Sequence, residues 1–392
     1  MIRSSLKRLA QEALRSADLE RDASRVCIYS APWVMADDGP LRDGAVAIDH
    51  LGRIIATGPA AQVRSQFSWA QSADLGGILM PGFVNAHARL EVGAGDRLPE
   101  GLGITRKLQA LRAMRKADDQ LDPNSREAKI RAAVRRSVAA GNAAVGDVTD
   151  SLRAVPAMGR EGLYGIVFHE VGEFSKRRAA KALAAAAIQR ARVVPWPEGI
   201  RYRLAPHFLF STAEAALREL LARSSAELPT YADELGDLSP DDLLVHLHQA
   251  SRDVIQRVAE ASAPLVLCPR SSLHDTGELP PLPSLLEEGC RIALGTDSPA
   301  SAPDQSVLRE ASELHAAFPE VPALVLFTAA TAGGADALGL PSMGSLQPGK
   351  APGLLHADLA GTTTDDPAGW LLRAGEPNLA WISRPAPPRH AA

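Results

Sequence analysis

The stretch "GILMPGFVNAHARLE", residues 77–91, decides the fold that the sequence predicts. An apolar run and a Pro-Gly step lead into a short strand that carries His87 to its end. Side chains on a strand alternate between two faces, so His87 and residue 89 project to the same side, a spacing that suits two ligands of one metal ion. Residue 89 is arginine, whose guanidinium has five hydrogen-bond donors and no free lone pair. The sequence thus predicts a strand end suited to a metal but altered at one ligand position.

Short apolar runs alternate with helical patterns from residue 78 to about residue 340. This alternation predicts a parallel α/β architecture of the TIM-like (β/α) barrel type. Polar residues stand at the ends of the predicted strands, where such barrels carry their chemistry. These residues are His87, Asp147, His169, His207, His246 and Asp297.

The flanking segments predict a second, smaller domain. Residues 26–76 and 341–385 read as short strands and turns, and we expect them to pair as a small β-sandwich built from both chain ends around a barrel at 77–340. Residues 1–25 have the apolar spacing of an amphipathic helix, and residues 386–392 have the composition of a disordered tail.

Composition excludes several classes of protein. The 392 residues carry a net charge of -4, which gives no electrostatic basis for nucleic-acid binding. The three cysteines, Cys27, Cys268 and Cys290, are too far apart for a disulfide framework, so we expect a cytoplasmic protein. No apolar run approaches the roughly 18 residues that a membrane span needs.

Several polar residues are candidates for chemistry. His246 and His248 form a His-x-His pair in "VHLHQ", on one face of a strand. Asp297 in "ALGTDSPAS" is a metal ligand, a base or a helix N-cap. His207, and the pair His169-Glu170, either contact a substrate or are structural polar groups.

Seven motifs occur in an order typical of one superfamily. They are "LMPGFVNAHARLE", "VFHEV", "LAPHFLFS", "LLVHLHQ", "VLCPRSS", "ALGTDSPASAPD" and "GSLQPGK". The chain resembles the amidohydrolase superfamily over about residues 26–360, within the metal-dependent aminohydrolases and chlorohydrolases that include aminodeoxyfutalosine deaminase-like proteins. The resemblance implies a (β/α)8-type barrel with a small β-sandwich. It also implies one zinc or iron ion that activates a water molecule for C–N hydrolysis of small ring compounds.

The resemblance also assigns roles to residues. His87, His246 and Asp297 match metal ligands, Asp297 also matches the residue that orients and deprotonates the water, and His207 matches a substrate contact. Arg89 replaces the second histidine ligand. The fifth β/α unit, with a histidine ligand and the glutamate that shuttles protons, is predicted to be absent, because no histidine lies between His207 and His246.

Two hypotheses follow. In the first, the metal site is degraded, and Arg89 occupies the vacated position and pairs with Asp297. The protein then acts as a binding or scaffold protein, either as a homo-oligomer or beside an intact paralogue. In the second, His87, His246 and Asp297 hold one divalent metal, His248 or His207 transfers protons, and Arg89 contacts a substrate anion in the barrel mouth, which Glu170 also lines. The protein is then a hydrolase of small heterocyclic amines.

Overall fold

The computed structural model describes residues 26–92, 98–171, 176–206, 238–247, 250–374 and 377–387. Five predictions concern residues that lie wholly or largely outside these ranges: the amphipathic helix at 1–25, the roles of His207 and His248, the missing fifth unit, which would fall within 207–237, and the disordered tail at 386–392.

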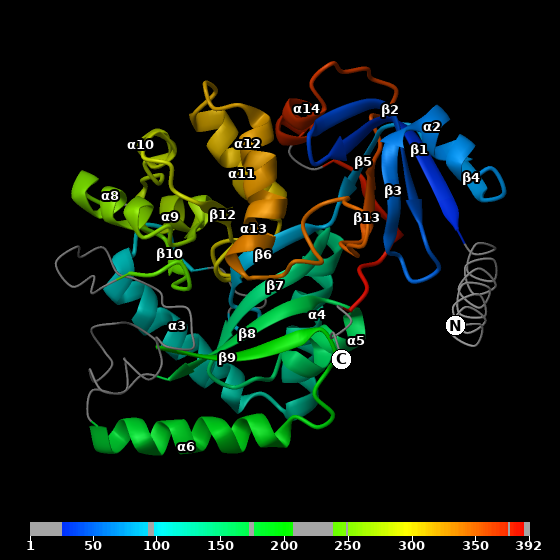
Figure 1. Cartoon of the computed structure of the whole chain (residues 1–392). Helices are drawn as coiled ribbons and strands as arrows, with labels where there is room; N and C mark the ends of the chain where they lie inside the picture. Colours follow the sequence, from blue (N-terminus) through cyan, green and yellow to red (C-terminus); the bar gives the residue numbers. More distant parts are fainter. Residues whose placement is uncertain are drawn as a thin grey trace, which may run out of the picture.

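Strands from both chain ends form one seven-stranded sheet, drawn in blue and in orange to red in Figure 1. Its order is β14-β13-β5-β1-β2-β3, with β4 also paired to β1. The strands are β1 (Cys27–Ala36), β2 (Gly39–Ile48), β3 (Ile54–Pro59), β4 (Gln71–Asp74), β5 (Ile78–Pro81), β13 (Leu354–Ala357) and β14 (Leu379–Ser383). Because β5 pairs with both β1 and β13, this sheet continues past the predicted boundary at residue 76.

Two parallel sheets follow in the middle of the chain. The first has the order β6 (Phe83–Ala88), β7 (Asn142–Thr149), β8 (Tyr164–Val171) and β9 (Ile200–Pro206). The second has the order β10 (Leu244–Val245), β11 (Leu265–Leu267) and β12 (Ile292–Leu294). The parallel α/β architecture is therefore present, whereas a closed barrel lacking one unit stays a prediction.

The end of β6 joins the two parallel sheets. Ala88 forms an isolated parallel bridge with Asp297, in the segment after β12. The backbone N–H groups of Thr296 and Asp297 donate to the carbonyl oxygen of His87 at 2.9 and 3.1 Å. These bonds fix His87 and Asp297 beside each other although they are far apart in the sequence.

Helices connect and cover the strands (Figure 1). They are α2 (Ala60–Gln66), α3 (Gly103–Gln120), α4 (Pro123–Ala139), α5 (Val155–Glu161), α6 (Lys176–Arg192), α8 (Arg252–Glu260), α9 (Pro269–Thr276), α10 (Leu282–Glu287), α11 (Val307–Ala317), α12 (Ala323–Thr328), the π-helical η3 (Ala329–Gly333), α13 (Gly334–Ala337) and α14 (Pro367–Ala374). The start of α4 is set locally, because Asp122 accepts the N–H groups of Asn124 and Ser125 and Pro123 needs no partner at the first position. Within the described part of the chain, every helix is too short or too polar to cross a bilayer.

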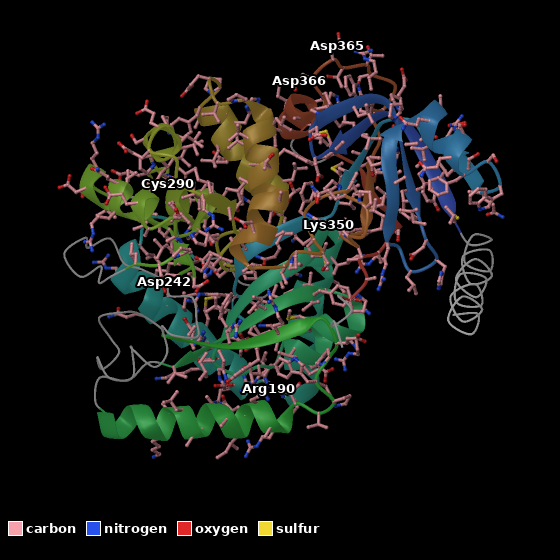
Figure 2. All side chains as sticks on the ribbon, in the orientation of Figure 1. Arg190, Asp242, Cys290, Lys350, Asp365 and Asp366 are labelled. Atoms are coloured by element: carbon pink, nitrogen blue, oxygen red, sulfur yellow. The ribbon has the colours of Figure 1, made fainter. Side chains whose placement is uncertain are left out.

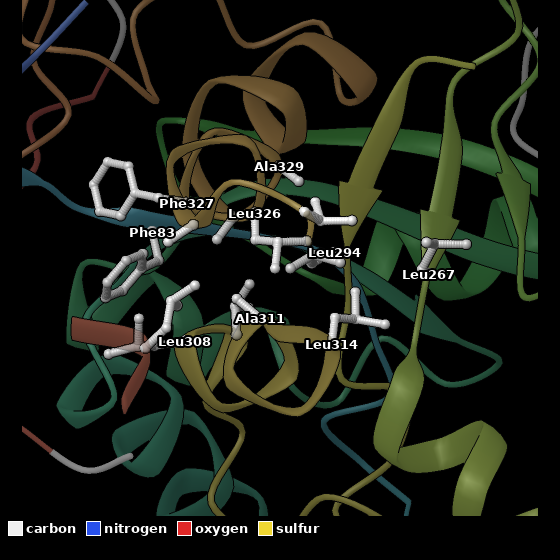
Figure 3. Packing of buried hydrophobic residues seen from close by; sticks show 14 of the residues in the cluster. Phe83, Leu267, Leu294, Leu308, Ala311, Leu314, Leu326, Phe327 and Ala329 are labelled. Carbon is white, nitrogen blue, oxygen red and sulfur yellow. The ribbon is translucent and has the colours of Figure 1, made fainter. Parts of the chain in front are cut away.

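Apolar side chains of α11 and α12 pack on β6 and β12 (Figure 3). Phe83 of β6 and Phe327 of α12 meet edge to face with ring centroids 6.2 Å apart. Leu294 of β12 and Leu308 of α11 are buried in the same cluster. The strand that carries His87 and the strand that leads to Asp297 therefore share one core.

On the other side of the molecule, α6 makes a cation–π contact with the loop that leads into β9. Arg190, labelled beneath the sheet in Figure 2, lies with its guanidinium 3.7 Å from the ring centroid of Trp196. Trp196 in turn meets Tyr202 of β9 edge to face at 5.9 Å.

Candidate functional site

Three predicted metal ligands lie together at the ends of different strands. His87 is on β6, His246 follows β10, and Asp297 follows β12. Each offers one possible ligand atom, and these atoms all lie within 4.8 Å of one another. His246 and Asp297 have φ angles of 76° and 53°, a left-handed conformation that costs a non-glycine residue energy and is often retained at functional sites.

Arg89 lies in this cluster, but its guanidinium is directed mainly at Glu170. Its Nη1 and Nη2 atoms donate to the two carboxylate oxygens of Glu170 at 3.0 and 2.9 Å. Its Nε atom lies 3.6 Å from Oδ1 of Asp297, within ion-pair range but beyond a hydrogen bond. The predicted Arg89–Asp297 pair is present, as the weaker of these two contacts.

Lys107 of α3 is the residue that the sequence reasoning missed. Its ammonium donates to Oδ2 of Asp297 at 2.6 Å, to Oδ2 of Asp275 at 2.5 Å and to Oγ of Ser271 at 3.0 Å. The Ser271 hydroxyl also donates to Oδ2 of Asp297, at 2.7 Å. Nothing in the sequence around Lys107 separates it from an ordinary lysine on an amphipathic helix, so only the tertiary structure identifies it.

The charges in this cluster hold one another ionised. Burial alone would lower the pKa of the Lys107 ammonium, but the carboxylates of Asp297 and Asp275 outweigh burial and raise it above its usual range. Burial would raise the pKa of Asp297, but Lys107, His87 and His246 together hold it well below its usual range. Near neutral pH the cluster therefore contains a protonated lysine in contact with an ionised aspartate.

As they stand, these residues do not fit a divalent metal ion. The donor types are right for zinc, since two imidazoles and a carboxylate converge. However, Lys107 and Ser271 already donate to one carboxylate oxygen of Asp297, and Arg89 lies near the other. At an effective dielectric constant of 20, a dication roughly 5 Å from an ammonium is repelled by about 7 kcal/mol.

A second buried carboxyl group lies beside the cluster. Asp147 of β7 is fully buried, and its Oδ1 accepts the backbone N–H of Leu90 at 2.9 Å. Its Oδ2 has no hydrogen-bond partner among the described residues. Burial and the nearby carboxylate of Glu91 raise the pKa of Asp147 to about 7.

His169, the neighbour of Glu170, contacts Tyr202 of β9. Its Nδ1 is 2.9 Å from the Tyr202 hydroxyl, and burial lowers the pKa of its imidazole. Close to it, a charged cavity of about 220 Å³ opens between the ends of β6 and β7 and the helices α3, α4 and α6, with Glu91, Asp150 and Gln189 in its wall. The arrangement of Glu170 on one side of the strand and His169 on the other matches the alternation of a β-strand.

A parallel β/α fold with histidines and an aspartate at its strand ends is the arrangement found in metal-dependent hydrolases. Comparison with known proteins specifies the family. A sequence profile described as "Amidohydrolase family" matches residues 203–382. A 5-methylthioadenosine/S-adenosylhomocysteine deaminase from Haloquadratum walsbyi is 30% identical over 322 residues, covering 72% of this chain and 72% of the relative. An aminodeoxyfutalosine deaminase from Deinococcus radiodurans is 26% identical over 348 residues, covering 73% and 79% of the two chains.

Solved structures show the same fold. Aminofutalosine deaminase from Helicobacter pylori, in complex with methylthio-coformycin, superimposes with a TM-score of 0.77 at 18% identity, covering 92% of this chain and 99% of that one. Atrazine chlorohydrolase from Arthrobacter aurescens, complexed with zinc, gives a TM-score of 0.75 at 20% identity and covers 92% of each chain. The chain belongs to the amidohydrolase family and is a deaminase-like member of it, which confirms the resemblance read from the seven motifs.

Proposed function

We propose that this deaminase-like protein binds a small heterocyclic molecule at the strand ends without carrying out ordinary metal-assisted hydrolysis. One observation carries the proposal: both carboxylate oxygens of Asp297 face protein cations, Lys107 at 2.6 Å and Arg89 at 3.6 Å. In a metal-water hydrolase this carboxylate binds the metal and orients the attacking water. An aspartate that two cations already engage is not available for either task.

The charge balance of the cluster supports the same proposal. Arg89 and Glu170 neutralise each other through two parallel hydrogen bonds, and Lys107 lies between the carboxylates of Asp275 and Asp297. Burial of these groups is tolerable because each is paired. A dication would have to displace at least one of these contacts.

The names of the relatives support a chemical class for the ligand. Relatives at 30% and 26% identity are named for the deamination of 5-methylthioadenosine and S-adenosylhomocysteine and of aminodeoxyfutalosine. We therefore propose an adenosine-type nucleoside with a thioether or similar substituent as the first ligand class to test. His207 and Glu170 remain proposed contacts for it, and a homo-oligomer or a paired paralogue remains a proposed setting.

The alternative function is a hydrolase with one metal ion. It is favoured by the convergence of His87, His246 and Asp297 within 4.8 Å. It requires Lys107 to leave Asp297 and Arg89 to turn toward a substrate anion, and it makes His248 or His207 the proposed proton-transfer residue.

Two measurements on protein purified without chelator distinguish these functions. Elemental mass spectrometry reports metal per chain for the wild type and Asp297→Ala. Calorimetric titration with 5-methylthioadenosine, followed by an ammonia assay, reports binding and turnover. The proposal expects less than about a tenth of an equivalent of metal, with binding but no ammonia. About one zinc or iron ion per chain, lost in Asp297→Ala, together with ammonia release, would establish the alternative.

A further inference from the structure

We infer that Lys107 is a built-in cation that excludes a divalent metal from this centre, and that removing its ammonium opens a zinc site made by His87, His246 and Asp297. The inference rests on the proposed function, in which the natural protein works without a metal. It goes beyond that function because it assigns the exclusion chiefly to Lys107, whose ammonium lies 2.6 Å from Asp297, whereas the guanidinium of Arg89 lies 3.6 Å from Asp297 and is neutralised by Glu170. It also predicts a metal site that the natural protein does not use.

The contacts of Lys107 account for its whole hydrogen-bonding capacity. A lysine ammonium has three donors, and here the three face Asp297, Asp275 and Ser271 at 2.6, 2.5 and 3.0 Å. The Lys107 side chain is 10% exposed and that of Asp297 is 4% exposed. An ammonium held in this way is a fixed part of the site rather than a mobile surface charge.

Contacts between α9 and the segment before α3 fix the position of Lys107. Ser271 and Asp275 lie four residues apart on α9, so they share one face of that helix. The segment before α3 is tied to the same helix, because Nε2 of His274 contacts the carbonyl oxygen of Leu98 at 2.9 Å and Gly101 donates its N–H to the carbonyl of His274 at 2.8 Å. The start of α3 is thereby fixed against α9, and Lys107 follows within about two helical turns.

The number of buried charges explains why a dication is expected to bind when the Lys107 ammonium is removed. The Asp275 and Asp297 carboxylates carry two negative charges, of which Lys107 neutralises one. When an uncharged residue replaces Lys107, two negative charges stay buried beside two imidazoles. Zinc supplies two positive charges and prefers these donor types. A purely structural ion pair between Lys107 and Asp297 would not require two histidines nearby, yet His87 and His246 place ligand atoms within 4.8 Å of Asp297.

The test measures zinc binding directly, without an activity assay. Wild type, Lys107→Met, Lys107→Gln and the double variant Lys107→Met/Asp297→Asn are dialysed against the same low-micromolar zinc, and bound zinc and thermal stability are measured. Lys129→Met is the matched control, because Lys129 of α4 pairs with Asp118 at 3.0 Å outside the cluster. We expect about one zinc per chain for Lys107→Met and Lys107→Gln, and less than about a tenth for the wild type, the control and the double variant.

Three other outcomes would overturn the inference, alone or together with the proposed function. Zinc-free Lys107→Met and Lys107→Gln beside a zinc-free wild type would overturn this inference and leave the proposed function standing. A wild type that already binds one zinc through Asp297 would overturn the proposed function and the inference together. If both variants unfold in the absence of metal, zinc added during refolding must restore their folded circular dichroism, and failure to do so overturns the inference.

Discussion

Replacing Glu170 by alanine is the strongest test of how the Arg89 side chain is held. The Arg89 and Glu170 side chains are 8% and 4% exposed and joined by two hydrogen bonds. Removing one partner of a buried ion pair costs about 3–5 kcal/mol, because the other charge is left in the interior. Arg89 retains Asp297 at 3.6 Å, so we expect the lower end of that range, about 3 kcal/mol.

A double-mutant cycle separates the pair from its surroundings. Urea unfolding is measured for the wild type, Glu170→Ala, Arg89→Met and the double variant, and the coupling energy should be about 2–3 kcal/mol. The matched control is the pair Arg160–Glu127, which has a similar distance of 2.7 Å but side chains that are 54% and 56% exposed. Its coupling should stay below about 1 kcal/mol. Additive single effects at Arg89 and Glu170, or a loss below about 1 kcal/mol in Glu170→Ala, would refute the reasoning.

Three further predictions concern residues around the cluster. The pKa of Asp147 is raised to about 7, above its unfolded value near 4, so its contribution to stability is complete below pH 4 and is lost as the pH rises through 7. The free energy of unfolding of Asp147→Asn relative to the wild type should therefore rise by about 3 kcal/mol between pH 5 and 8, and a flat difference would contradict this. A Cβ at Gly295 would lie 2.8 Å from the backbone N and O of His87, so Gly295→Ala should destabilise the protein by about 2 kcal/mol or more in urea unfolding, whereas Gly76→Ala, with open space around it, should change it little. Glu310 is fully buried, and its carboxylate accepts hydrogen bonds from Nε of Arg270 at 2.8 Å and from the backbone N–H of Arg270 at 2.9 Å. Glu310→Leu should therefore lower the free energy of unfolding by about 3 kcal/mol or more. A smaller loss than that caused by Asp304→Ala, whose side chain is 28% exposed, would argue against this assignment.

The sequence predicts which strand ends come together, because hydrophobic periodicity and polar strand ends are local signals. His87, His246 and Asp297 follow apolar strands, and parallel strands bring such ends to one edge of a sheet. The resemblance to the family also came from local motifs, and the comparisons confirm it.

The partners of the charged side chains could not be predicted in the same way. Analogy with a vacated metal position predicts that Arg89 pairs with Asp297, but the nearer carboxylate is that of Glu170 on β8. Lys107 and Asp275 come from two helices that are far apart in the sequence, and which lysine of an amphipathic helix turns inward depends on how that helix is packed. The role of Glu170 as a neutralising partner therefore emerges only from the folded arrangement.

The position of β5 has a consequence for synthesis on the ribosome. β5 lies between β1, made before it, and β13, made near the other end of the chain, and Gly82 alone separates it from the strand that bears His87. During vectorial synthesis one edge of β5 therefore has no strand beside it until residue 357 has left the exit tunnel, and an open strand edge is a site for premature pairing. Slowed translation or a chaperone that shields this edge should raise the yield of folded protein more than either would for a chain whose sheets are completed in the order in which they are made.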